Sequence, residues 1–200
     1  MSLKEDLGQL LVSLSPRTRQ RLERSLIDTH PLQLFTVLSD VTATVAVRQL
    51  AGVLLAKQIP SFWSVASVSE RLKLQSSFLI SLDSLDCEGA VLRSLVDCTA
   101  CVANCLAMDG MAWQDLFLWM RGVASEAQAN QTNQLGQLSS FGSMASGSGY
   151  VYSSSHSIRK RSAFLYLLDR LLESAPWRAF LEPHVMEISE LLYRMATSPS

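Results

Sequence analysis

Residues 46–63 read AVRQLAGVLLAKQIPSFW, and this stretch decides which fold the chain is expected to have. Its apolar side chains recur at the i, i+3, i+4, i+7, i+8 spacing that places them on one face of a helix. That face consists of Val47, Leu50, Ala51, Leu54 and Leu55. Proline lacks a backbone amide hydrogen, so Pro60 is expected to end the helix, with Phe62 and Trp63 following as apolar anchors. Residues 42–58 are therefore predicted to form a helix that lies on a core.

The same periodicity predicts further helices, joined by short turns, on both sides of this stretch. They cover about 3–14, 16–29, 31–41, 67–83, 88–107, 111–126, 158–172 and 184–197. The helix at 67–83 is expected to bury Val68, Leu72, Phe78, Leu79 and Leu82. Runs of β-branched residues are scarce, which favours helix over strand. The chain is predicted to be all-α.

Composition excludes several classes of protein. Hydrophobic residues make up 48% of the 200 residues, enough for a core, and the net charge of −1 gives no basic excess for nucleic-acid binding. No uncharged apolar stretch approaches the roughly 18 residues that span a bilayer. The first six residues include two acids, which argues against a secretory signal. We expect neither a nucleic-acid nor a membrane partner.

Residues 127–157 differ from the rest of the chain. They are rich in Gln, Asn, Ser and Gly, and we interpret them as a flexible insertion. The basic cluster Arg159-Lys160-Arg161 follows it, at the expected first turn of the next helix. Because the helix dipole disfavours cations in a first turn, the cluster is predicted to make a specific acidic contact.

The helices contain a repeated pattern. Val47-Arg48-Gln49-Leu50 and Leu92-Arg93-Ser94-Leu95 lie 45 residues apart, and a third match, Lys160-Arg161-Ser162-Ala163, follows 68 residues later, after the insertion. A spacing of about 40–47 residues is typical of HEAT and armadillo repeats. We therefore predict one domain, residues 1–200, with a HEAT-type superhelix of about four antiparallel helix pairs. The last pair covers about 158–197.

Residues 46–63 resemble the second HEAT repeat in the N-terminal region of the importin-β superfamily, the karyopherin transport receptors. Ala112-Trp113-Gln114-Asp115-Leu116 is similar to the start of the third repeat's second helix, and Arg159-Lys160-Arg161 to the start of the fourth repeat. The importin-β-like part is about 16–126, and the insertion at 127–157 departs from the family pattern. The resemblance implies a non-enzymatic scaffold in nucleocytoplasmic transport, present in cytoplasm and nucleus.

The resemblance also implies partners: the GTPase Ran in its GTP form, bound by the second helix of each pair, and a protein cargo. Polar residues on these helices are the candidate partner-binding residues: Gln33, Asp40, Glu70, Lys73, Asp83, Asp115, Glu187 and Glu190. The alternative is that they are ordinary solvated helix positions. A HEAT or armadillo adaptor for another protein is the alternative function. A solenoid cut near 185–195 could also dimerise through its exposed end.

Four cysteines, Cys87, Cys98, Cys101 and Cys105, lie close together in sequence. The last three share a helix face and could bind a metal with the first. Structural zinc sites, however, use ligand pairs from turns separated by a spacer. The simpler interpretation is that they are small buried apolar side chains, reduced in a cytosolic or nuclear protein.

No arrangement of residues in the sequence predicts catalysis. There is no phosphate-binding glycine loop and no His-Glu-x-x-His motif. His30, His156 and His184 have no neighbours in sequence that would build a catalytic triad. We therefore expect no enzyme, no cofactor and no metal.

Overall fold

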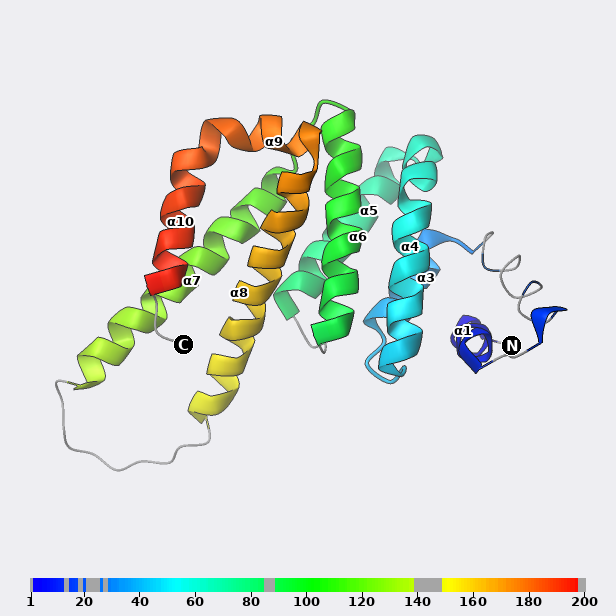
Figure 1. Cartoon of the computed structure of the whole chain (residues 1–200), viewed down its shortest axis with the longest axis horizontal. Coiled ribbons are helices and arrows are strands. Elements are labelled where there is room, and N and C mark those ends of the chain that lie inside the picture. The colour runs from blue at the N-terminus through cyan, green and yellow to red at the C-terminus, as the bar shows by residue number, and fades with distance from the viewer. Residues whose placement is uncertain are drawn as a thin grey trace. The chain divides into compact units, whose positions relative to one another are not determined.

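The computed structural model describes residues 2–12, 15–17, 20, 26, 29–84, 89–138 and 149–197. Every regular element in these ranges is helical, which confirms the all-α prediction (Figure 1). The predicted helix at 16–29 lies mostly outside the described residues. The elements are α1 (Leu3–Val12), α3 (Pro31–Ser39), α4 (Val45–Val65), α5 (Val68–Ser84), α6 (Gly89–Met108), α7 (Gln114–Leu138), α8 (Gly149–Glu173), α9 (Ala175–Leu181), the short 3-10 helix η1 (Glu182–His184) and α10 (Val185–Thr197).

The chain divides into two compact units, Met1–Cys105 and Leu106–Ser200. The first unit holds α1, α3, α4, α5 and most of α6. The second holds the end of α6 and α7 to α10. Each unit has its own set of buried apolar side chains.

Helix α4 is the central element of the first unit and packs against both α1 and α3. Thr44 caps its N-terminus, with the side-chain oxygen accepting from the Val47 amide at 3.4 Å. The buried positions repeat every four residues: Val47, Ala51, Leu55, Ile59 and Trp63. Leu50 and Leu54, predicted to face the core, are only partly buried.

Pro60 does not end α4, which continues to Val65. A proline inside a helix costs about 3 kcal/mol through the lost hydrogen bond and its steric clash. Trp63 is one turn beyond Pro60 and is 3% exposed, so the continued helix keeps its side chain in the core. Burying a large apolar side chain, at about 1.5–3 kcal/mol, offsets much of that cost.

The backbones of α4 and α6 approach closely at Gly52. A Cβ at this position would lie 2.6 Å from Cβ of Ser94 and 3.4 Å from Cδ1 of Leu38. One turn further along α6, the Cys98 thiol donates to the Gly52 carbonyl at 3.2 Å. Glycine is therefore required here for the approach of α6, since any side chain would push the two helices apart.

Helix α5 begins with a capping box. The Ser67 amide donates to Oε2 of Glu70 at 2.9 Å, and the Glu70 amide donates to Oγ of Ser67 at 3.3 Å. The core-facing residues are Leu74, Phe78 and Leu82, all fully buried. The prediction is right for Phe78 and Leu82 and omits Leu74. It is wrong for Val68 and Leu72, which lie on the surface, and Leu79 is only partly buried.

Helix α6 is the most apolar segment of the chain. It is long and apolar enough to cross a bilayer by length and composition, but 72% of its most hydrophobic window is buried inside the structure. That burial is typical of the core helix of a folded unit. Its buried apolar residues include Val91, Leu95 and Val102.

The second unit is built on α7 and α8, and α10 packs against α7 (Figure 1). Its core includes Leu116 and Met120 from α7 and Phe164, Leu167 and Leu171 from α8. Trp177 and Leu181 of the short α9 are also buried. By contrast, Leu172 at the end of α8 and Val185 at the start of α10 are 45% and 53% exposed.

Residues 127–157, predicted to be a flexible insertion, are helical over much of their length. Helix α7 continues to Leu138 and α8 begins at Gly149, while 139–148 lie outside the described residues. The basic cluster is consequently in the interior of α8, not in a first turn. Its Lys160 is buried, with Nζ 3.5 Å from Oε1 of Glu126, so the predicted acidic contact is confirmed for this lysine.

Candidate functional site

The outer face of α5 carries a row of exposed apolar side chains. Val68, Leu72 and Ile80 are 73%, 57% and 69% exposed. They recur at i, i+4 and i+12, so they lie along one ridge of the helix, with Ser76 completing the row. Lys73 and Asp83 are exposed beside them. We call these six residues the α5 surface: Val68, Leu72, Lys73, Ser76, Ile80 and Asp83.

The core anchors α5 on its opposite side. Phe78 packs edge-on against Phe35 of α3, with ring centroids 4.9 Å apart. At the N-terminal end, the Arg71 guanidinium lies 5.1 Å above the Trp63 ring, and its Nε donates to the Ala66 carbonyl at 3.2 Å. The apolar row is thus held on a rigid element, as a recognition surface requires.

The eight candidate partner-binding residues are divided between the two units. Gln33, Asp40, Glu70, Lys73 and Asp83 belong to the first unit, and Asp115, Glu187 and Glu190 belong to the second. Of these, Gln33, Lys73, Asp83, Asp115 and Glu190 are exposed. Only Lys73 and Asp83 lie on the α5 surface.

At least three of the eight have structural partners within their own unit. Glu70 completes the α5 capping box, and its Oε1 lies 3.8 Å from Nε2 of His30. The hydrogen bonds from Ser67 lower the pKa of Glu70 below its ordinary value. Glu187 pairs with Arg121 of α7 at 2.7 Å, which fastens α10 to α7. Asp40 is the third.

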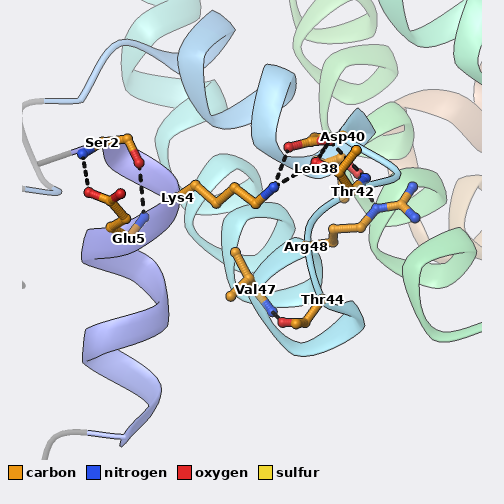
Figure 2. Close-up of polar contacts among 9 residues, drawn as sticks. All are labelled: Ser2, Lys4, Glu5, Leu38, Asp40, Thr42, Thr44, Val47 and Arg48. Atoms are coloured by element: carbon orange, nitrogen blue, oxygen red, sulfur yellow. Dashed lines mark hydrogen bonds and ion pairs between the residues drawn. The ribbon is translucent and has the colours of Figure 1, made fainter.

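Asp40 connects α1 to the turn after α3 (Figure 2). Its Oδ2 accepts from Nζ of Lys4 at 2.9 Å, and its Oδ1 accepts from the amide and the hydroxyl of Thr42 at 2.8 and 2.7 Å. These hydrogen bonds, chiefly those from the Thr42 hydroxyl and Lys4, lower the pKa of Asp40 to about 2. The Asp40 carboxylate therefore has a structural role, because it joins α1 to the turn after α3.

This pKa predicts a pH dependence of stability. A folded-state pKa of about 2, below the ordinary aspartate value of 3.8, means that ionised Asp40 stabilises the fold above about pH 4. That contribution is lost as the pH falls from about 4 through about 2. The difference in unfolding free energy between the wild-type chain and Asp40→Asn, measured in urea, should be constant from pH 7 to 5 and shrink below pH 4. A difference that does not change with pH would contradict this role.

Three of the four cysteines, Cys98, Cys101 and Cys105, lie on α6. Cys98 is fully buried and Cys105 is 9% exposed, while Cys101 is partly buried. Burial raises the pKa of the Cys98 thiol well above its ordinary value, and burial also raises that of Cys101. Protonated thiols are poor metal ligands and poor nucleophiles. Cys87 lies outside the described residues, and the described part of the chain contains no group of metal-ligating side chains.

The burial of Arg48 is a feature that the sequence pattern did not predict. Arg48 lies in the first turn of α4, is 7% exposed, and its Nε donates to the Leu38 carbonyl at 2.8 Å. The equivalent residue in the second motif, Arg93, is exposed. Arg48 lines a cavity of about 280 Å³ between α3, α4, α5 and α6. A position in a repeat motif therefore does not reveal whether its side chain is buried.

Comparison of the chain with protein-family models, with curated protein sequences and with solved structures finds no match.

Proposed function

We propose that this chain is a protein-binding scaffold with the HEAT-type architecture of a karyopherin N-terminal region, and that the α5 surface binds Ran in its GTP form. The observation that carries the proposal is the row of Val68, Leu72 and Ile80 on the outer face of α5. Exposed apolar side chains grouped on a rigid element and bordered by charges are typical of protein-interaction sites.

The packing of α4 against α6 supports the repeat architecture. The Cys98 thiol and the Gly52 carbonyl are in contact and lie 46 residues apart, close to the spacing of the repeated motif. In stacked repeats, equivalent positions of successive units meet in this way. Helices α4 and α6 would then be the first helices of successive pairs, and α5 the second helix of the pair that α4 begins.

The chemistry of the α5 surface suits a folded protein partner. Leu72 and Ile80 supply area that is buried on contact, and the oppositely charged Lys73 and Asp83 border it and would orient the partner. We propose that protein cargo binds elsewhere on the scaffold and that the chain acts in cytoplasm and nucleus. Asp40, Glu70 and Glu187 are better explained by their intramolecular contacts.

The experiment is a calorimetric titration of the whole chain with Ran, loaded with a GTP analogue and separately with GDP. We expect binding to the GTP form alone. The variant Leu72→Asp/Ile80→Asp should weaken this binding by about 30-fold or more, because two central apolar contacts are replaced by charges. Both positions are exposed, so circular dichroism should show an unchanged helix content.

A matched control adds the same two charges elsewhere in the first unit. Val12 of α1 and Val53 of α4 are 77% and 49% exposed, and Val12→Asp/Val53→Asp should bind like the wild type. Absence of wild-type binding to both nucleotide forms would refute the transport assignment and leave an adaptor for another protein. Equal loss in both double variants would refute the α5 surface as the site.

A further inference from the structure

The cavity beside Arg48 lies within the first unit and has two kinds of lining. Leu38, Val41, Val91 and Leu95 make its apolar walls, and Arg48, Ser39, Ser81 and Ser84 bring polar groups to it. A volume of about 280 Å³ holds a small organic molecule or a single large side chain, and is far larger than one water needs.

The charge of Arg48 is not balanced within the described part of the chain. The one hydrogen bond of its guanidinium to the described residues is the 2.8 Å contact from Nε to the Leu38 carbonyl. No described carboxylate forms an ion pair with it. Asp40, the acid nearest in sequence among the described residues, instead pairs with Lys4 and accepts a hydrogen bond from Thr42. In Figure 2 the terminal nitrogens of Arg48 point away from the Lys4–Asp40 pair.

Two physical effects make an unbalanced cation costly at this position. Arg48 is only 7% exposed, so its charge loses most of its contact with water without gaining a charged partner, and this desolvation is unfavourable. The first turn of a helix is also the positive end of its dipole, and the Arg48 amide already bonds the capping residue Thr44 at 3.0 Å. An anion seated in the cavity would relieve both effects, and a guanidinium can bind a carboxylate through two parallel hydrogen bonds.

We propose that this cavity binds a carboxylate attached to an aliphatic body. Arg48 pairs with the carboxylate, the serine hydroxyls of Ser39 and Ser81 can donate to it, and Leu38, Val91 and Leu95 cover the aliphatic part. The carboxylate is the end of a peptide with an apolar last residue or a small free carboxylic acid; both have the same chemistry. The proposal stands independently of the proposed binding to Ran.

The test titrates the complete chain with three probes and follows binding by NMR chemical shifts. The probes are N-acetyl-Gly-Leu-Leu with a free carboxylate, the same peptide with a C-terminal amide, and 4-methylpentanoate. We expect the amide to bind at least about 10-fold more weakly than the acid, because it cannot form the charged pair. If the peptide acid binds more tightly than 4-methylpentanoate, the ligand is the C-terminus of a peptide. If 4-methylpentanoate binds more tightly than the peptide acid, the ligand is a small free carboxylic acid.

Two variants assign the binding to the cavity. Arg48→Gln should lose binding, and Ser81→Leu, which keeps Arg48 and its bond to Leu38, should lose it by filling the space. Equal affinity for acid and amide, no binding of either acid, or acid binding that survives both variants would overturn the proposal. Binding of inorganic phosphate in place of the carboxylates would also overturn it.

One further variant tests for a carboxylate supplied by the chain itself. Asp86 and Glu88 lie outside the described residues. In Asp86→Asn/Glu88→Gln the affinity for the peptide acid should stay within about twofold of the wild type. Binding that is seen only in this variant would show that the chain's own carboxylate fills the cavity, and would overturn the proposal.

Discussion

Replacing Phe78 with alanine should lower the unfolding free energy by about 3–5 kcal/mol, the largest stability effect we expect for one substitution. Phe78 is fully buried, and it contacts the Phe35 ring edge-on at 4.9 Å. The alanine variant loses the transfer free energy of the ring and leaves a cavity between α3 and α5. Urea unfolding followed by circular dichroism measures the difference.

Ile80 provides the matched control, because it lies two residues away on the same helix and is 69% exposed. Ile80→Ala should change stability by no more than about 0.5 kcal/mol. If both alanine variants lose the same stability, the core face of α5 has been wrongly assigned, and with it the α5 surface.

The second large effect is expected at Gly52. Gly52→Ala should destabilise the chain by about 1–3 kcal/mol, because its Cβ would lie 2.6 Å from the Ser94 Cβ. That contact joins two atoms fixed to helix backbones, so no rotation of a side chain can relieve it. Alanine's higher helix propensity, worth about 1 kcal/mol, opposes this loss and does not remove it.

Gly122 of α7 is the control, since an added Cβ there meets nothing within 4 Å. Gly122→Ala should therefore stabilise the chain by up to about 1 kcal/mol, the opposite sign. The double variant Gly52→Ala/Ser94→Gly restores room between α4 and α6 and should lose less stability than the sum of the two single variants. Strict additivity would contradict a direct clash.

Periodicity predicted α5, α6 and α10 to within a few residues, because each has a strong apolar stripe and a clear break at both ends. It assigned the wrong face in part of α5. This helix has apolar residues on two ridges, Val68-Leu72 and Leu74-Phe78, and the helical spacing alone fits both. Contacts with Phe35 of α3, distant in sequence, decide which ridge is buried.

Local signals failed where tertiary contacts outweigh them. Pro60 predicts the end of a helix, yet Ile59 and Trp63 on either side of it are buried, and the helix continues. The Ser- and Gly-rich composition of 127–157 predicts a flexible segment, yet α7 and α8 extend into it.

The candidate site was only partly predictable for the same reason. Lys73 and Asp83 were identified by their polarity and position on α5. Leu72 and Ile80 could not be identified, since an apolar residue on a helix is more often buried than exposed. The burial of Arg48 depends on three neighbouring helices, and the exposed Arg93 in the same motif shows that sequence alone does not determine it.

The central claim is that the α5 surface binds a protein partner, and amide hydrogen exchange of the whole chain tests it most directly. Exchange is measured with the chain free and with Ran loaded with a GTP analogue in excess. We predict that exchange slows at residues 68–84 and stays unchanged in α1. Exchange that is identical in both samples, or that slows only outside residues 68–84, would contradict the assignment of this surface.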